Sequence, residues 1–387
     1  MAIYCVSDLH LHDDDQPYLF TADKERVLAA MCDEVLRDGD SQLVLAGDFL
    51  DLTGMNPPDK GVHEFFAKTL PPDRVDAAVA TAGAVRDAAT RVQAVAARFP
   101  AAFAAFAKLA QAGRLVFMPG NHDWEVGYDP RGRQAFAAAL GVTEAQLAVK
   151  DDYYVDGIWI GAHGHDFDPS NKTSGGVVNR GQIITAALYH VIMPALRILG
   201  MPESMVAAIP AVRPEENIVD GIELALPQRE SDAFLRALVQ LLYDNGYFHG
   251  LARAEAWTAL HVAPGVLTAE RLRESLANDS DMKEVFRQSV AGLLDGRDQR
   301  YADKKTKLVV LGHTHEFDYE LGRYVHLGTW IDHVPDLSAK SLSAPDYSLP
   351  LLRVDGNSVV VHDLYALIAR PGPIDTAPRM ASFHVAS

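Results

Sequence analysis

The sequence has few cysteines and an excess of acidic residues over basic ones. Cys5 and Cys32 are its two cysteines, and both lie in apolar segments. They provide no disulfide framework, so we expect buried free thiols in a reducing compartment. The formal net charge of −17 disfavours binding to nucleic acid or anionic lipid, because both favour a basic patch. An anionic substrate remains compatible with this charge, since a bound metal can reverse the local potential.

The first residues do not show the pattern of a secretory signal, and the sequence has no unbroken apolar run. Residues 1–8 contain no basic region and enter an apolar segment at once, so no secretory signal is expected. The most apolar later stretch, 183–201, is interrupted by His190, Pro194 and Arg197. Such interruptions argue against a membrane span. We therefore expect a cytoplasmic protein with no transmembrane segment.

Five apolar, strand-type segments are each followed by residues that can bind metals. The segments are 2–6, 42–46, 114–118, 158–160 and 307–311. A helical stretch, 21–37, separates the first two, so these strands are expected to be parallel with their ends side by side. Open α/β sheets bind ligands at such ends. The residues that follow the segments are Asp8 and His10, Asp48, Asn121, His163, and His313 and His315.

The remaining chain is largely helical in pattern. Residues 73–112 are alanine-rich, with a helix break expected at Pro100. Between 171 and 305, amphipathic helical stretches alternate with prolines, and strand-type segments resume only at residue 307. The tail is rich in proline and small residues, which is typical of loose order. We expect a core of residues 1–170 and 306–370, a helical insertion or cap at 171–305, and a loosely ordered tail at 371–387.

The seven candidate ligands are more informative together than singly. Any one of these histidines, taken alone, is more often a structural residue with satisfied hydrogen bonds. Several of the seven adjoin glycine, which lets the backbone turn tightly and approach a ligand. Imidazole and oxygen ligands without thiolate suit Mn, Fe or Zn. Seven ligands exceed one tetrahedral ion and fit two transition-metal ions about 3.5–4 Å apart with a bridging carboxylate, an arrangement used for phosphoester hydrolysis.

The motifs occur in a fixed order along the chain. They are Asp8-Leu9-His10, Gly47-Asp48-Phe49-Leu50-Asp51, Gly120-Asn121-His122-Asp123, His163-Gly164 and Gly312-His313-Thr314-His315. This set resembles the calcineurin-like metallophosphoesterases, whose pattern is D-x-H, G-D-x-x-D, G-N-H-[DE], H-G and G-H-x-H. The resemblance implies an α/β four-layer sandwich of the metallophosphoesterase type, with two mixed β-sheets face to face and helices outside, here with a helical cap.

The resemblance also implies a role for each motif residue. Two divalent or trivalent transition-metal ions would be held, with Asp48 bridging them and a metal-bridging hydroxide attacking phosphorus. The implied ligands are Asp8, His10, Asp48 and His315 for one ion, and Asn121, His163 and His313 for the other. His122 would assist the leaving group, and Asp51 would hydrogen-bond its imidazole and favour its protonated form.

Three further residues are candidates for supporting roles. Asp123 is expected to brace the turn that carries Asn121, rather than to act on the substrate. His165 and Arg180 are candidate substrate contacts, although polar residues near a metal site and exposed basic residues commonly have no such role.

Two departures from the family pattern bear on the substrate. Phosphoprotein phosphatases follow G-D-x-x-D with Arg-Gly, whereas Leu52-Thr53 follows Asp51 here. The His163-Gly164 element and the helical insertion look more like the UDP-2,3-diacylglucosamine pyrophosphatase branch, whose typical members carry Arg where His122 stands. We expect hydrolysis of phosphomonoesters or phosphodiesters on a small molecule or a lipid headgroup. The alternative is a pyrophosphatase acting on a nucleotide-diphosphate lipid.

The apolar positions between Ile183 and Leu199 could line a lipid pocket or touch a membrane surface, but packing within the cap explains them more simply.

A noncatalytic metal-binding scaffold is the rival from another functional class. Such a protein would be expected to have lost ligands or the equivalent of His122, and this chain keeps them all. A nuclease is opposed by the acidic balance of the chain.

Overall fold

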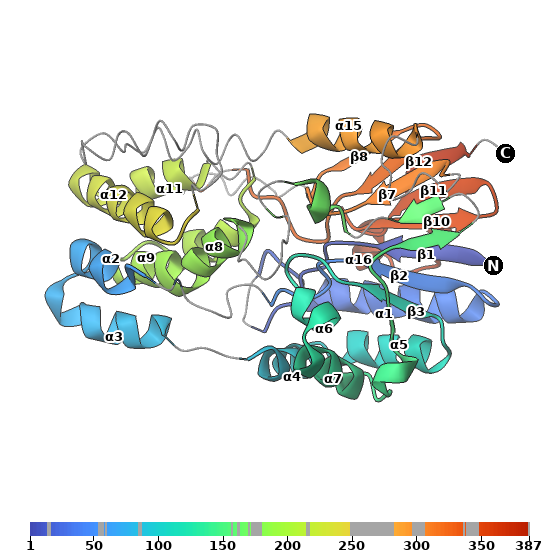
Figure 1. Cartoon of the computed structure of the whole chain (residues 1–387), viewed down its shortest axis with the longest axis horizontal. Coiled ribbons are helices and arrows are strands. Elements are labelled where there is room, and N and C mark those ends of the chain that lie inside the picture. The colour runs from blue at the N-terminus through green and yellow to red at the C-terminus, as the bar shows by residue number, and fades with distance from the viewer. Residues whose placement is uncertain are drawn as a thin grey trace.

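The computed structural model describes residues 1–13, 17–52, 58, 60–83, 87–155, 158–160, 163–168, 171, 180–213, 217–247, 282–295, 306–335, 337 and 348–385. The strands gather in one half of the molecule and a group of helices forms the other half (Figure 1). Parts of the insertion predicted at 171–305, including 248–281 and 296–305, lie outside the described residues.

Two β-sheets form the strand half. The seven-stranded sheet has the order β12-β11-β10-β1-β2-β3-β4, and the five-stranded sheet has the order β5-β6-β7-β9-β8. The strands of the larger sheet are β1 (Ala2–Val6), β2 (Gln42–Ala46), β3 (Leu115–Met118), β4 (Ala148–Val149), β10 (Pro350–Asp355), β11 (Ser358–Asp363) and β12 (Arg379–His384). Those of the smaller sheet are β5 (Tyr153–Val155), β6 (Ile158–Ile160), β7 (Leu308–Leu311), β8 (Phe317–Glu320) and β9 (Tyr324–Leu327).

Strands β1 to β4 pair in parallel, and so do β6, β7 and β9. The register pairs Val6 with Leu45 and Ala46 with Met118, so the chain leaves these three strands at one edge of the sheet. The five predicted strand segments and the parallel arrangement of the first two are confirmed. The polar residues after them are brought together because parallel strands end on the same side.

The central strands are buried on both faces, which explains their continuous apolar sequences. Tyr4, Leu45 and Phe117 face the helices on the outside of the larger sheet. Their neighbours Cys5 and Val44 face the other sheet, in a core that also holds residues of β6, β7 and β9. The expected α/β class with two sheets is therefore confirmed, and both thiols are buried as predicted.

Helices cover the outer faces of both sheets. On the smaller sheet, α15 (Met282–Leu294) packs through Val290 and Leu293 against β7 and β9. The helix break predicted at Pro100 is confirmed, because α4 ends at Arg98 and α5 begins at Pro100. The helices on the larger sheet are α1 (Ala22–Arg37), α4 (Ala88–Arg98), α5 (Pro100–Gln111), α6 (Trp124–Tyr128), α7 (Pro130–Ala139) and α16 (Ala366–Ala369).

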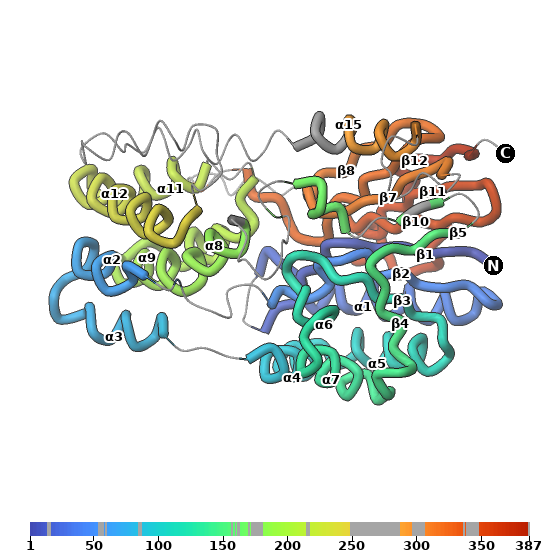
Figure 2. The backbone as a smooth tube through the Cα atoms, viewed as in Figure 1, coloured from blue at the N-terminus to red at the C-terminus, as the bar shows by residue number. Residues whose placement is uncertain are grey.

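The second half of the molecule is a helical lobe with a hydrophobic core of its own. It combines two distant parts of the chain, and Figure 2 shows the early helices α2 and α3 beside α9 and α12. The proline pairs at 57–58 and 71–72 predict a loop in this part of the chain. That prediction is wrong for residues 62–69, which form a helix. The lobe consists of α2 (Val62–Thr69), α3 (Pro72–Ala82), α8 (Arg180–Ala187), the π-helix η3 (Leu188–Ile192), α9 (Met193–Ile198), α10 (Glu203–Ala208), η4 (Ile209–Ala211), α11 (Asn217–Ala225) and α12 (Gln228–Asp244).

One helical run among the described residues, 181–198, is long and apolar enough to cross a membrane. This property rests on length and composition alone, and core helices of soluble proteins share it. In this protein 44% of the run is buried, and Val191, Ile192 and Leu196 pack in the core of the helical lobe.

The prediction of a loosely ordered tail after residue 370 is wrong. Strand β12 pairs antiparallel with β11 along the edge of the larger sheet. Ala381 and Phe383 are buried while Ser382 and His384 are exposed, which is the alternation of a half-buried strand. Small and polar residues hid this pattern, because only the alternate positions carry apolar side chains.

A buried lysine ties the larger sheet to the loop that follows β9. Lys24 in α1 is 2% exposed, and its Nζ donates to Leu19 O at 2.7 Å, Trp330 O at 2.6 Å and Asp332 Oδ1 at 2.6 Å. Trp330 in turn donates its backbone N–H to Asp8 O at 3.0 Å. Lys24 therefore supports the loop that carries Asp8.

We expect Lys24→Met to destabilise the protein by about 3–5 kcal/mol, because it leaves the Asp332 carboxylate buried without its cation. Urea denaturation measures this loss. The double variant Lys24→Met/Asp332→Leu should recover most of the stability, since neither charge is then buried alone. A single variant as stable as the wild type would contradict the supporting role of Lys24.

Candidate metal centre

The strand ends hold an unusual concentration of left-handed backbone. Among the described residues, six residues other than glycine have a positive φ, and all six are predicted ligands. They are Asp8 (54°), His10 (48°), Asp48 (50°), His163 (55°), His313 (87°) and His315 (61°). Each such residue costs on the order of 1–3 kcal/mol and persists only where its surroundings enforce it. This local strain gathers around one point in the fold.

Backbone hydrogen bonds hold the loops after β1 and β2 in this shape. Asp8 N donates to Gly47 O at 3.1 Å, and His10 N donates to Asp48 O at 2.9 Å. The two loops thus continue the parallel pairing of their strands for several residues. Within the smaller sheet, Gly312 N donates to His163 O at 2.8 Å and joins the loops after β7 and β6. Between the sheets, His313 N donates to Asp8 Oδ2 at 3.1 Å. These bonds bring ligands from both sheets to one place.

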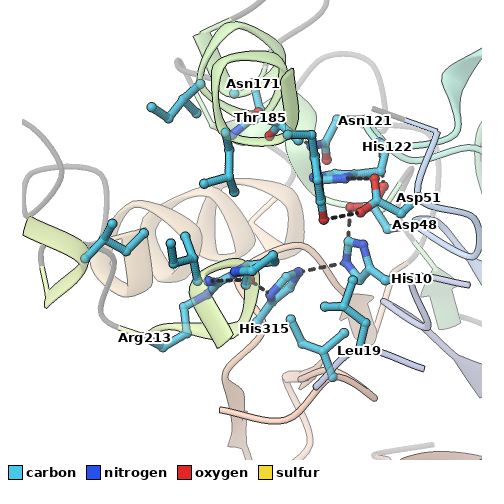
Figure 3. Close-up of a pocket in the computed structure, with 18 of the residues that line it drawn as sticks. His10, Leu19, Asp48, Asp51, Asn121, His122, Asn171, Thr185, Arg213 and His315 are labelled. Atoms are coloured by element: carbon cyan, nitrogen blue, oxygen red, sulfur yellow. Dashed lines mark hydrogen bonds and ion pairs between the residues drawn. The ribbon is translucent and has the colours of Figure 1, made fainter. Parts of the chain in front are cut away.

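The first candidate ligand set is fully buried. Its ligand atoms all lie within 4.8 Å of one another, and its members are Asp8, His10, Asp48 and His315. His315 Nε2 lies 3.3 Å from Asp8 Oδ1, and His10 Nε2 lies 3.0 Å from His315 Nε2 (Figure 3). Burial opposes the charge on Asp8, but the nearby imidazoles hold its pKa well below the usual range. The set therefore presents an ionised carboxylate and imidazole nitrogens, which suits a cation.

The second candidate set shares Asp48 with the first and adds His163 and His313. His163 Nε2 lies 2.9 Å from Asp48 Oδ2, yet it makes no hydrogen bond in the described part of the chain. Asn121 Oδ1 is likewise buried without a hydrogen-bond partner there. An unpartnered buried oxygen is costly unless something else satisfies it. A metal ion at this point would satisfy both atoms, so the residues present fit such an ion.

His122 and Asp51 form a pair beside these sets. His122 Nδ1 lies 3.1 Å from Asp51 Oδ1, and His122 N donates to Asp48 Oδ1 at 2.8 Å. Burial opposes a charge on His122, but the carboxylates of Asp48 and Asp51 outweigh it and raise the pKa of His122 to about 9. His122 and Asp51 form, together with His10, a third group that could hold an ion. The pairing of His122 with a buried carboxylate instead favours a protonated imidazole aimed at the cavity.

Asp123 joins the turn after β3 to the loop after β2. Its carboxylate accepts from Gly120 N at 2.6 Å, Phe49 N at 2.8 Å and Leu50 N at 3.1 Å. Burial and the charge of Asp48 raise the pKa of Asp123 to about 7, whereas the three amide donors favour its ionised form. Asp123 is 0% exposed, so it lies beneath the turn, away from the cavity.

The two candidate substrate contacts lie differently. His165 is buried, with its ring centroid 5.9 Å from that of His163 and 6.4 Å from that of His313. It lies behind these ligands and is not among the described residues that line the cavity. Arg180 begins α8, and its side chain lies outside the described residues.

The helical lobe supplies two side chains that the sequence did not point to. Tyr189 Oη donates to Asp51 Oδ2 at 3.1 Å, and Arg213 Nη2 lies 3.0 Å from His315 Nδ1. Tyr189 sits in the π-helix η3, just before Pro194, which lacks the N–H that an α-helix would direct to His190 O. Such irregular turns are frequent at functional sites. The interrupting proline was the one available signal.

A chain of polar contacts connects two ligands of the second set. Asn121 Nδ2 donates to Asn171 Oδ1 at 3.5 Å, Asn171 Nδ2 donates to Asp168 Oδ2 at 2.6 Å, and Asp168 Oδ2 lies 2.9 Å from His313 Nε2. The amide of Asn121 is thereby turned with its oxygen toward the centre. Sequence spacing gave no indication of Asn171, because it follows no strand.

Glycines make room for the ligands at two points. A Cβ on Gly47 would lie 2.4 Å from the His163 side chain, and one on Gly120 would lie 2.1 Å from Asp48 Oδ1. Gly47 also has a φ of 86°, which favours glycine. The glycine before each of these motifs is therefore required by close approach of a ligand from another loop.

The candidate centre opens into a cavity of about 280 Å³ between the strand ends and the helical lobe. Figure 3 shows His10, Asp48, Asp51 and His122 on one side of this cavity and Arg213 on the other.

Comparison with known proteins assigns the chain to no family. A scan against protein-family models finds no match to the chain, and a search of curated proteins finds none either.

We expect Gly47→Ala to destabilise the protein by about 3 kcal/mol or more, because it combines left-handed backbone with overlap on His163. Gly39→Ala is the matched control. Gly39 also has a positive φ, 51°, but a Cβ there meets nothing within 4 Å, so about 1–2 kcal/mol is expected. Urea denaturation compares the two. Equal losses would show that the approach of His163 is not what requires glycine.

Proposed function

We propose that this protein is a dinuclear metal-dependent phosphoesterase of the calcineurin-like metallophosphoesterase superfamily. It would hydrolyse phosphomonoesters or phosphodiesters on a metallophosphoesterase-type four-layer sandwich with the helical lobe as its cap. The observation that carries the proposal is the pair of buried ligand sets that share the carboxylate of Asp48. A shared carboxylate is what two closely spaced ions require.

The donor atoms support ions of a particular kind. Both sets consist of imidazole nitrogens and carboxylate or amide oxygens, and the two cysteines of the chain lie elsewhere in the core. Such ligands suit Mn, Fe or Zn. Asn121 Oδ1, which has no hydrogen-bond partner in the described region, would complete the second set together with His163 and His313.

Each part of the site has a task in phosphoester hydrolysis. Two bound ions would supply activation of a water molecule and neutralisation of charge on the phosphoryl oxygens. His122 would donate its proton to the departing oxygen as the P–O bond breaks. Asp51 keeps that imidazole charged and correctly turned, through the 3.1 Å contact with Nδ1, and Tyr189 orients Asp51 from the helical lobe.

The proposal predicts different losses for two variants. Asp48→Asn should weaken metal binding and abolish turnover, because both sets lose their shared carboxylate. His122→Ala should keep the metals and lower kcat by about 10²–10⁴-fold for alkyl phosphates. The loss should be much smaller for aryl phosphates with acidic phenols, since a good leaving group needs no proton. Metal analysis and steady-state kinetics on both ester types measure this.

The scaffold alternative makes the opposite prediction. If the metal-loaded wild type and both variants share one background rate across a broad panel of monoesters, diesters and nucleotides, the protein binds metals without catalysing hydrolysis. Thr90→Ala, on the exposed surface of α4, is a control that should leave turnover unchanged.

Asp168 should control the second ion selectively. Partners of metal-binding histidines typically contribute 10–100-fold in metal affinity, and Asp168 contacts His313 at 2.9 Å. We expect Asp168→Asn to weaken the second of two Mn²⁺ binding events by about that factor and to leave the first unchanged. Calorimetric titration of metal-free protein resolves the two events. Equal weakening of both would assign Asp168 a general structural role.

A further inference from the structure

The cavity at the candidate centre has two chemically different ends. One end carries the polar groups, including His10, Asp48, Asn121 and His122. The other end is formed by the helical lobe and is apolar. Its wall is made by Ile184, Leu188, Ile192, Ile209, Ile218 and Ile222.

The apolar wall is not simply part of the packed core. Ile192, Ile209 and Ile222 are fully buried, but Ile184 and Leu188 on one helical run and Ile218 on another are only half-buried. Their remaining surface borders the cavity. Water in such a space finds few hydrogen-bond partners, so an apolar group that displaces it gains free energy. The apolar stretch 183–199 thus serves both purposes considered for it, since some of its residues pack and others line a pocket.

The positive charge of Arg213 lies beside His315 of the first candidate ligand set, across the cavity from His122. Arg213 is the one lysine or arginine among the described residues that line the cavity, and its Nη2 lies 3.0 Å from His315 Nδ1. Its backbone is fixed to the segment that follows β9, because Arg213 N donates to Val334 O at 3.0 Å. A single cation beside the ligand sets favours one phosphate at the polar end. The isoleucine-lined end has no basic side chain within the described lining to bind further phosphates.

The size of the cavity limits what the apolar end can take. Its volume of about 280 Å³ lies near the lower limit of ordinary small-molecule pockets, which span roughly 300–1,000 Å³. A single chain or ring can fit such a space, whereas a pair of long acyl chains exceeds it.

We propose that the substrate is a phosphoester with a single phosphate and one apolar substituent of medium length, and that this substituent lies against Ile184, Leu188 and Ile218. The phosphate lies at the ligand sets, near Arg213, and the bond to be broken is within reach of His122. This inference rests on the proposed phosphoesterase function. It disfavours the nucleotide-diphosphate lipid considered from the sequence, because the described lining of the apolar end offers neither cations nor space for one.

Straight-chain alkyl phosphonates test this inference, because they cannot be hydrolysed and their binding is read without turnover. Calorimetry on the metal-loaded protein would compare methyl, butyl, hexyl, octyl and dodecyl phosphonate. We expect affinity to rise by about three- to fourfold per added methylene and to level off once the cavity is full. Uridine diphosphate should bind no more tightly than hexyl phosphonate. Equal affinity across the alkyl series, or tighter binding of the nucleotide, would overturn the proposal.

Substitutions in the apolar wall test where the alkyl chain of these phosphonates binds. Leu188→Gln should flatten the dependence on chain length and leave the affinity for methyl phosphonate unchanged. Leu224→Gln is the matched control, since Leu224 is 71% exposed on α11 and outside the described lining; it should keep the wild-type dependence. Ile218→Thr, at another half-buried position of the wall, replaces Leu188→Gln if that variant does not fold. If the affinity of a folded wall variant still rises with chain length as it does in the wild type, the proposed location of the apolar substituent is wrong.

The same experiment separates the two proposals. If phosphonates bind independently of chain length while alkyl phosphates are hydrolysed, the apolar substituent is wrong and the phosphoesterase function stands. If no phosphonate binds and no ester is hydrolysed by protein that carries two ions, the proposed function fails, and the inference that rests on it fails as well.

Discussion

The Asp48 carboxylate is the group on which the rest of the site depends. Oδ2 lies 2.9 Å from His163 Nε2, and Oδ1 accepts the N–H of His122 at 2.8 Å. Asp48 thus contacts a histidine delivered by the smaller sheet and the turn that follows β3. Gly120 has no side chain because the space where its Cβ would lie is taken by this carboxylate. Neutralising so many buried polar groups requires either a complete hydrogen-bond network or cations. Among the described residues the network is incomplete at Asn121 Oδ1.

The strained backbone follows from the same requirement. Ligands that leave parallel strands must turn back over the sheet edge within one or two residues to meet each other. Six of them do so through left-handed φ angles, which the paired loops and the buried Lys24 hold in place. Rigid strands on both sides prevent these residues from relaxing, so the strain is localised where ligands must converge.

The helical lobe is part of the site as well as a cover over it. Tyr189 reaches Asp51 and Arg213 reaches His315, so the lobe contacts both the His122–Asp51 pair and the first candidate ligand set. Gly181 at the start of the same helical run lies against Asn171, since a Cβ there would approach its side chain to 1.8 Å. The position of this lobe therefore affects both the geometry of the ligands and the shape of the cavity.

The sequence by itself determined the five strand segments that precede the polar residues, the helix break at Pro100 and the set of polar residues at these strand ends, because apolar periodicity and local motifs are written in neighbouring residues. It misjudged the edge strand β12, whose alternation is weak in apolar side chains. Only the tertiary structure decided the left-handed backbone, the chain from Asn121 through Asn171 and Asp168 to His313, and the contributions of Tyr189 and Arg213. These depend on segments far apart in sequence, and their mutual positions are set by the packing of two sheets and a helical lobe, which no local pattern encodes.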